Sequence, residues 1–255
     1  MTNSQKRNQG LLNVYFTAGY PHKESLHSIL PALIEGEVDY IEIGLPYSDP
    51  LADGPVIQMA SKQAIENGMN IDILFYQLSK HLDLMKRKPV YLMGYFNQML
   101  QFGIENFLKE CQKVNVAGVI IPDLPMDYFE REMKTLFEKY GIKITFLVSP
   151  LTSEDRIKKA SELSTGFVYV VSSPAITGTK AVFDEHMIAY LKKLAGMKLN
   201  RVLLLGFGIQ DKKSFELANA YLNGAIVGTA FLKTLINGET DKNQILQFLS
   251  QFKID

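Results

Sequence analysis

The sequence has a single cysteine, no excess of charge of either sign and no long apolar run. With only Cys111 present, an internal disulfide framework is excluded and a reducing compartment is favoured. The 27 basic and 27 acidic residues balance, so no broad field points to nucleic acid or to an anionic membrane. No stretch approaches the roughly 18 consecutive apolar residues of a membrane span, and residues 1–10 contain no apolar signal-peptide core. We therefore expect a soluble, cytoplasmic protein in which Cys111 packs inside a helix.

Several common kinds of site also lack their residues. The histidines show no spacing typical of metal ligands, so no metal site is expected. They are His22, His27, His81 and His186. No lysine lies in a strand interior, where a Schiff base would be expected, and no Ser–His or Cys–His arrangement is visible. Neither a P-loop nor a dinucleotide fingerprint is present, so ATP and NAD are not supported.

What the sequence does contain is a regular alternation of short apolar runs with longer helical patterns. The runs, rich in Val, Ile and Leu, span residues 11–19, 38–46, 88–96, 116–125, 141–150, 165–174, 201–209 and 222–230. Such near-continuous apolar runs are typical of parallel strands covered by helices. Helices are expected at residues 24–36, 126–141, 152–164 and 241–253. The long segment 55–87 predicts an additional helix after the second strand.

Strand–helix units of this number and length predict one α/β domain over residues 1–255, a (β/α)8 TIM barrel. A doubly wound open sheet is the alternative, because right-handed β–α–β crossovers build either fold. In a barrel, the functional site lies at the C-terminal ends of the strands and in the loops that follow them.

Glu42 is an unusual residue for a strand that enters a core. It lies between Ile41 and Ile43, and side chains alternate along a strand, so we expect Glu42 to point into the barrel. Burial there would raise the pKa of the carboxyl group toward the range that suits general acid–base catalysis. The alternative is a structural carboxylate paired with a buried basic residue. However, Lys180 is the one basic residue near a predicted strand end.

The loops after the predicted strands add a second carboxylate and a set of small residues. Asp53 lies in a Leu-Ala-Asp-Gly-Pro segment, which alone predicts no more than a turn. Close behind Glu42, however, it is a candidate to divide acid and base roles with that residue. Small residues recur at 176–179, 206–208 and 228–229. Backbone N–H groups in such late loops commonly bind phosphate, so we expect a phosphate monoester there rather than simple turns.

Residues 41–58, IEIGLPYSDPLADGPVIQ, closely resemble the signature of tryptophan synthase α chains. Other segments are similar to the family's loops at matching places: FTAGYP (16–21), IPDLP (121–125), YVVSSPAITG (169–178), GFGI (206–209) and VGTA (227–230). The resemblance implies a lyase that cleaves indole-3-glycerol phosphate into indole and glyceraldehyde 3-phosphate. It also implies an αββα heterotetramer in which indole passes to a partner β chain. Pyridoxal phosphate is then expected on the β chain only, with no cofactor on this chain.

The resemblance implies a role for each matching residue. The catalytic residues would be Glu42, which moves the protons at indole C3 and at the glycerol hydroxyl, and Asp53, which acts at the indole nitrogen. Phosphate would be bound by Gly178, Gly206, Gly208, Gly228 and Thr229. The indole pocket would be formed by Phe16, Met93, Ile120, Tyr169 and Phe207. Two flexible loops would contain Ile57 and Thr177.

Two positions depart from the family pattern and concern loop closure and partner contact. Ala175 stands where many members have glycine, and Gln98 follows Asn97 where members usually have proline. Asp49 is expected to hold its loop or to touch the β chain, without a role in the chemistry.

Other functions remain as alternatives. One is a phosphate-binding barrel of another specificity, such as an epimerase or a free-standing indole-releasing lyase. Another is a silent subunit that only activates its β partner. The lack of metal ligands at the strand ends argues against an epimerase, and the presence of both Glu42 and Asp53 argues against a silent subunit.

Overall fold

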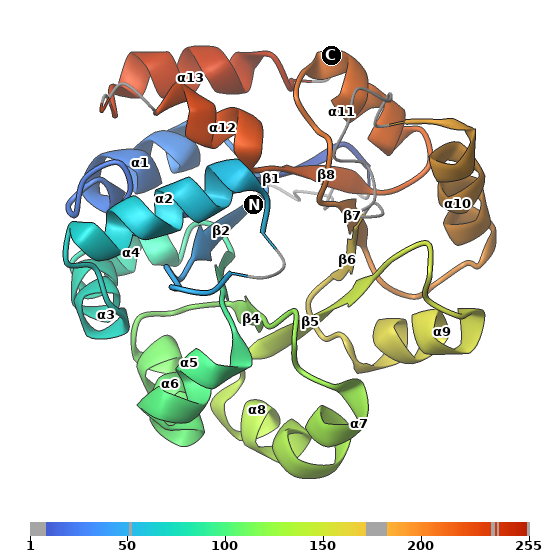
Figure 1. Ribbon diagram of the computed structural model, residues 1–255, viewed down its shortest axis with the longest axis horizontal. Helices are drawn as coiled ribbons and strands as arrows, with labels where there is room; N and C mark the ends of the chain where they lie inside the picture. Colours follow the sequence, from blue (N-terminus) through green and yellow to red (C-terminus); the bar gives the residue numbers. More distant parts are fainter. Residues whose placement is uncertain (1–8, 51–52, 172–182, 236–237, 239, 254–255) are drawn as a thin grey trace, which may run out of the picture.

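Eight parallel strands close into a barrel in chain order in the computed structural model, which describes residues 9–50, 53–171, 183–235, 238 and 240–253 (Figure 1). Closure is achieved because β1 pairs with both β2 and β8. The strands are β1 (Leu11–Thr17), β2 (Tyr40–Gly44), β3 (Val90–Met93), β4 (Gly118–Ile120), β5 (Lys143–Val148), β6 (Val168–Val170), β7 (Leu203–Leu205) and β8 (Gly224–Val227). The predicted barrel is therefore confirmed, and the open doubly wound sheet is excluded.

Helices surround the barrel and cover its outer face (Figure 1). They are α1 (Leu26–Glu35), α2 (Pro55–Glu66), α3 (Ile71–Ser79), α4 (Leu82–Met85), α5 (Phe96–Phe102), α6 (Ile104–Lys113), α7 (Met126–Tyr128), α8 (Lys134–Tyr140), α9 (Glu154–Leu163), α10 (Glu185–Gly196), α11 (Lys212–Asn219), α12 (Thr229–Thr234) and α13 (Lys242–Ser250). The additional helix expected after the second strand is confirmed, because α2, α3 and α4 all lie between β2 and β3. Cys111 is buried in α6, as expected. No helix in the described part of the chain is long and apolar enough to cross a membrane.

One predicted helix is interrupted. The helix expected over residues 126–141 consists of α7, a π-helical turn at Phe129–Met133, and α8. The π-helical turn buries both Phe129 and Met133 against the core. The two residues are four apart, a spacing that would place them on one face of a regular helix as well, so the burial pattern alone does not indicate the π-helical turn.

Three tyrosines inside the barrel lie directly against glycines of the next strand or its end. The pairs are Tyr15 with Gly44, Tyr91 with Gly118, and Tyr169 with Gly206. A Cβ atom added at any of these glycines would lie within 3.0 Å of an atom of its tyrosine. The large rings therefore fill the barrel interior only because the neighbouring strand has no side chain at that point.

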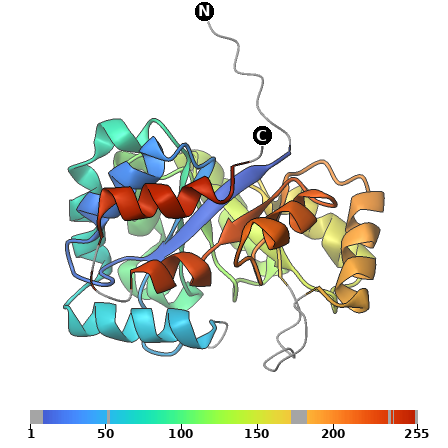
Figure 2. The ribbon, with the colours of Figure 1, turned by 90° about the horizontal axis from the view of Figure 1, so that it is seen from above.

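The two ends of the barrel differ in what surrounds them. Figure 1 looks onto the C-terminal ends of the strands, and Figure 2 shows α2 and α12 at this end and the beginning of β1 at the opposite end. The loop from β2 to α2 thus lies at the end where barrels of this type form their sites.

Candidate active site

Glu42 is fully buried inside the barrel, on β2. Its Oε2 accepts a hydrogen bond of 3.0 Å from Nδ2 of Asn13 on β1, and its Oε1 has no partner among the described residues. The pKa of the carboxyl group is raised from 4.5 to about 8, mainly by burial. The Asn13 hydrogen bond opposes this rise, and the nearby charge of Asp53 adds to it. Near neutral pH, most of Glu42 is therefore protonated and able to donate a proton.

No basic residue in the described part of the chain forms an ion pair with Glu42. Lys180, the basic residue considered from the sequence, lies outside the described residues. The structural alternative, a buried carboxylate neutralised by a basic side chain, thus finds no support in the described structure. Burial without a cation is instead what shifts a carboxyl group toward acid–base use.

Asp53 supplies a second carboxyl group, on the loop after β2. The hydroxyl of Tyr95 donates a hydrogen bond of 3.3 Å to its Oδ2. Burial raises the pKa of Asp53 from 3.8 to about 6, while the Tyr95 hydrogen bond lowers it. Near neutral pH, Asp53 is therefore mainly ionised while Glu42 is mainly protonated. Two carboxyl groups whose pKa values differ in this way can act as base and acid in one reaction.

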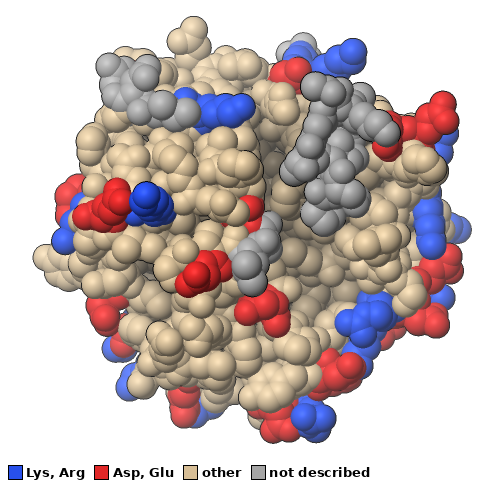
Figure 3. Space-filling model, in the orientation of Figure 1, with Lys and Arg blue, Asp and Glu red and all other residues tan. Residues whose placement is uncertain are grey.

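A cavity of about 450 Å³ opens beside Asp53 at the C-terminal ends of the strands. Figure 3 shows this face of the molecule hollowed near its centre, with acidic side chains nearby. The cavity is lined by Tyr15, Asp53, Gly54, Ile57, Met93, Pro122, Leu147, Tyr169, Val171, Gly206, Phe207, Gly208, Ile209, Gln210, Ile226, Gly228 and Thr229. These are mainly apolar walls with a single carboxylate and a group of small residues, which suits a flat apolar ligand that carries a polar group.

Most of the residues predicted from the sequence gather at this cavity. The predicted residues that line the cavity are Asp53, Ile57, Met93, Tyr169, Gly206, Phe207, Gly208, Gly228 and Thr229. Glu42 is not among the described lining residues but lies next to one of them, because its Cα pairs across the sheet with that of Tyr15. Gly178, Thr177 and Ala175 lie outside the described residues.

Phe16 and Ile120 are buried but do not occur among the described residues that line the cavity. On β1, side chains alternate, and it is Tyr15 that reaches the cavity and packs against Gly44. The neighbouring Phe16 thus points to the other side of the strand. On β1, Tyr15 lines the cavity, and a direct role for Phe16 or Ile120 in a ligand pocket remains a prediction.

Tyr15 is the main site residue that the sequence did not single out. Its hydroxyl lies 3.2 Å from Oγ1 of Thr17. Burial, with the nearby charges of Asp53 and Glu42, raises the pKa of Tyr15 above its usual range, against the lowering effect of Thr17. Tyr15 is thus a neutral hydroxyl close to both carboxyl groups. Alternation along the strand could have indicated Tyr15, because it shares one side of an otherwise apolar strand with Asn13 and Thr17, which carry polar groups.

The small residues form one side of the cavity. Gly206 and Gly208 follow β7, and Gly228 and Thr229 follow β8 and begin α12. Gly208 has a φ of 80°, in the left-handed region that favours glycine. None of the described lining residues is Lys or Arg. An anion bound on this side would therefore be held by backbone N–H groups and the Thr229 hydroxyl.

Gln98, where the resemblance suggested proline, connects two loops at the rim of the site. Its Oε1 accepts a hydrogen bond of 2.9 Å from the backbone N–H of Tyr95, and its Nε2 donates one of 3.0 Å to the carbonyl of Pro46. Nearby, Nδ2 of Asn97 donates to the Tyr47 hydroxyl at 3.2 Å. The loop that follows β2 is thus tied to the residue, Tyr95, that contacts Asp53. A proline at position 98 could make neither side-chain hydrogen bond.

Two further acidic residues near this end have structural contacts. Oδ1 of Asp123 accepts a hydrogen bond of 2.8 Å from the backbone N–H of Phe96, at the start of α5. Oδ2 of Asp49 accepts one of 2.6 Å from the Ser48 hydroxyl on the same loop. Both contacts are exposed: the Asp123 contact joins the segment after β4 to the start of α5, whereas the Asp49 contact is local, which agrees with the expectation that Asp49 holds its loop.

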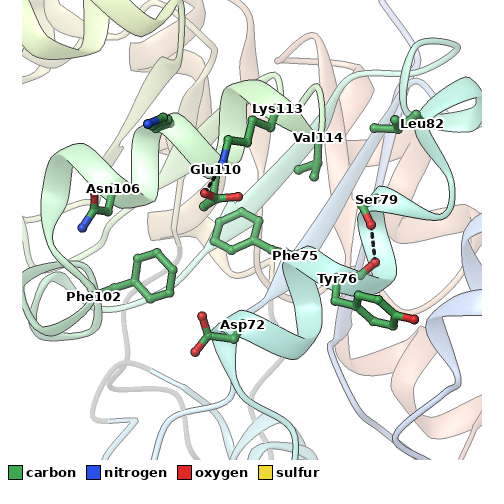
Figure 4. Close-up of a pocket in the computed structure, with 11 residues that line it drawn as sticks. Asp72, Phe75, Tyr76, Ser79, Leu82, Phe102, Asn106, Glu110, Lys113 and Val114 are labelled. Carbon is green, nitrogen blue, oxygen red and sulfur yellow. Dashed lines mark hydrogen bonds and ion pairs between the residues drawn. The ribbon is translucent and has the colours of Figure 1, made fainter.

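A larger cavity, about 670 Å³, lies in the helix layer and not at the barrel mouth. Figure 4 shows it between α3 and α6, with the rings of Phe75, Tyr76 and Phe102 around it. Two of its charged residues, Lys113 and Glu110, are already joined by a contact of 2.6 Å. Neither of the carboxyl groups with a raised pKa lines it, so we place the chemistry in the smaller cavity. In the described residues, no group of three or more His, Cys, Asp or Glu side chains could hold a metal ion.

Comparison with known proteins agrees with this geometry. A family model for the tryptophan synthase alpha chain matches residues 1–254. A tryptophan synthase alpha chain from Flavobacterium psychrophilum is 45% identical over 241 residues, 94% of this chain and 94% of that protein. The tryptophan synthase A-subunit of Pyrococcus furiosus is 30% identical, with a TM-score of 0.85 over 96% of this chain and 98% of that chain. A tryptophan synthase complex from the same organism is 29% identical, with a TM-score of 0.83 and the same coverage. The chain belongs to the tryptophan synthase alpha chain family.

Proposed function

We propose that this chain cleaves indole-3-glycerol phosphate into indole and glyceraldehyde 3-phosphate, as a carbon–carbon lyase of tryptophan biosynthesis. The observation that carries the proposal is the pair of carboxyl groups beside one cavity, with the pKa of Glu42 raised to about 8 and that of Asp53 to about 6. Membership of the tryptophan synthase alpha chain family supports the same reaction. A silent activating subunit is disfavoured, because an inactive chain has no need of one fully buried and one half-buried carboxyl group, both with a raised pKa.

Glu42 carries the protons of the bond cleavage in this proposal. The bond between indole C3 and the adjacent glycerol carbon breaks, C3 gains a proton, and the hydroxyl on the glycerol carbon loses one as the aldehyde forms. Protonated Glu42 gives its proton to C3, and the resulting carboxylate accepts the hydroxyl proton. The acid is regenerated within one turnover, so no external base is required.

Asp53 acts at the other end of the indole ring. Protonation of C3 makes the ring electron-poor and its N–H more acidic. A carboxylate that is ionised near neutral pH stabilises this charge or accepts the proton, and returns it when indole leaves. The Tyr95 hydroxyl, which donates to Oδ2 of Asp53, favours the ionised form that this role requires.

The remaining cavity residues bind the substrate. Met93, Tyr169 and Phe207, together with Tyr15, provide the apolar walls for the indole ring. The phosphate is assigned to the backbone N–H groups of Gly206, Gly208, Gly228 and Thr229, at the loops after β7 and β8. The assignment of Gly178 to phosphate binding and of Thr177 to a neighbouring loop rests on the family resemblance alone, and Ile57 is assigned to the edge of the cavity near Asp53.

We also propose a β chain as partner, in an αββα assembly that carries pyridoxal phosphate on the β chain alone. The related structure from Pyrococcus furiosus is a tryptophan synthase complex, which supports this assembly. The loop after β2 and Asn97 are the proposed contact surface. A cytoplasmic location is proposed as well, in keeping with the single, buried Cys111. Co-elution of the purified chain with a β chain at the mass of the heterotetramer tests the assembly, and separate elution at micromolar concentrations would contradict it.

The activity is tested by indole release from indole-3-glycerol phosphate, by the purified chain alone and with a β chain. We expect Glu42→Gln and Asp53→Asn each to lower kcat by about 10²- to 10⁴-fold, the usual contribution of a general acid or base. Glu66→Gln, an exposed change on α2, is the matched control and should be neutral. Absence of indole in the presence of a β chain, or near-normal turnover in either catalytic variant, would contradict the assignment.

A further inference from the structure

We propose that Asn13 is a positioning residue for Glu42: its amide holds Oε2 and thereby makes Oε1 the oxygen that exchanges protons with the substrate. This inference rests on the proposed function, because it assumes that Glu42 is the acid–base group. It begins from an unusual observation, a fully buried asparagine in the middle of an apolar strand. Asparagine is depleted in strands, and a buried amide without hydrogen bonds is costly.

The geometry couples the two side chains across neighbouring strands. In the register of β1 and β2, the Cα of Asn13 pairs with that of Tyr40, and the Cα of Tyr15 pairs with that of Glu42. Asn13 therefore lies diagonal to Glu42, and its Nδ2 reaches Oε2 at 3.0 Å. Both side chains are 0% exposed. This is the one hydrogen bond of the Glu42 side chain within the described part of the chain.

In the structure the amide of Asn13 presents Nδ2 and not Oδ1 to Glu42, and this orientation decides where the carboxyl proton can be. An amide N–H group donates hydrogen bonds and accepts none. A proton on Oε2 would therefore face another proton, from Nδ2, so the proton of neutral Glu42 is placed on Oε1. Oε1 has no partner in the described residues, which leaves it available to the substrate. With the bond to Oε2 in place, the carboxyl group also loses rotational freedom and presents Oε1 in one orientation.

The same hydrogen bond affects the pH range in which Glu42 is an acid. Asn13 opposes the burial that raises the pKa of Glu42, so its loss should raise this pKa further. The other titratable groups that surround Glu42 come from every side of the barrel. They are Asp53 on the loop after β2, Tyr15 on β1, Tyr91 on β3 and Tyr169 on β6. Because burial raises the pKa of all three tyrosines, Asp53 is the one neighbour of this set that changes charge near neutral pH.

The test compares Asn13→Leu with the parent enzyme, by indole release as a function of pH. Leucine has a similar size but cannot donate. We expect kcat to fall about 10- to 100-fold from the loss of alignment, with KM nearly unchanged. The fall in rate at high pH, where Glu42 ionises, should move to higher pH. Substitution of a residue with a structural role alone would leave the fall in rate at high pH where it is.

Two further variants keep the outcome decisive. Asn13→Asp preserves the shape of the side chain, so it serves if Asn13→Leu does not fold, and it should also lower kcat and move the high-pH limb upward. Gln77→Leu removes another buried amide, which donates to the carbonyl of Lys23 on the helix side, and should leave the pH profile unchanged. If both Asn13 variants keep the parent kcat and profile, the positioning role is refuted. If Glu42→Gln also remains active, the proposed function itself fails, so the two failures are distinguishable.

Discussion

Replacing Glu42 by glutamine should make the protein more resistant to unfolding as pH rises, while it removes activity. In the folded chain the pKa of Glu42 is raised from 4.5 to about 8, so the folded state holds a proton that the unfolded state releases between these values. When the folded state binds more protons, the free energy of unfolding falls as pH increases. The stability of the parent protein should therefore decrease from pH 4.5 upward and level off above pH 8. Glutamine has no proton to lose and should remove this decrease.

The size of the effect follows from the same two values. Since one pH unit corresponds to about 1.4 kcal/mol, the pKa of Glu42 lowers the free energy of unfolding by about 3 kcal/mol at pH 7, relative to acid conditions. Asp53, with a pKa raised to about 6, acts in the same direction but at lower pH. The interval from pH 6 to pH 8 therefore isolates Glu42. From pH 6 to pH 8 the free energy of unfolding of the parent should fall by about 2 kcal/mol through Glu42, and this fall should be absent in Glu42→Gln.

Urea unfolding followed by circular dichroism at pH 6, 7 and 8 measures this difference. The slope with pH carries the test, because the glutamine NH2 group can itself be left without an acceptor, at a cost of about 1–3 kcal/mol that is the same at every pH. Glu66→Gln on the exposed face of α2 should retain the parent slope. Parallel curves for Glu42→Gln and the parent would refute the argument that burial raises the pKa of Glu42.

Three further predictions concern the cavity. Tyr95→Phe removes the hydrogen bond that lowers the pKa of Asp53, so the fall of kcat/KM at low pH should move to higher pH; an unchanged profile would separate Tyr95 from the catalytic carboxylate. Gly206→Ala places a methyl group against the ring of Tyr169 and should cost about 1–3 kcal/mol in urea unfolding, whereas an unaffected midpoint would mean that the ring moves freely. Phe207→Ala should raise KM more than it lowers kcat, because this side chain lines the cavity without a reacting group; steady-state kinetics that show the reverse would contradict a binding role.

The sequence predicted the barrel well because each strand carries its own local signal. Near-continuous apolar runs and the intervening helical patterns require no knowledge of distant contacts, and alternation sufficed to turn Glu42 inward. The π-helical turn at Phe129–Met133 was missed because it changes the helical spacing for a few residues only. Tyr15 was not singled out because the site residues were assigned by motif position, whereas its place at the cavity follows from alternation along β1.

Contacts between strands could not be predicted in the same way. The hydrogen bond from Asn13 to Glu42 and the position of Tyr15 over Gly44 depend on the register between β1 and β2. In a barrel, this register is set by closure of the whole sheet and not by any one strand. The partner of Asp53, Tyr95, depends likewise on how two separate loops meet, which Gln98 helps to fix.

The tyrosine–glycine pairs inside the barrel have a consequence for how this interior can vary. A side chain larger than hydrogen at Gly44 or Gly206 is compatible with the fold only if Tyr15 or Tyr169, respectively, becomes smaller. Related barrels should therefore exchange bulk between the two strands of a pair while the total volume stays nearly constant. Because Tyr15 and Tyr169 also line the cavity, such paired exchanges would reshape the space available to a ligand. Changing the two members of a pair together is thus the route to altered substrate size that leaves the barrel packed.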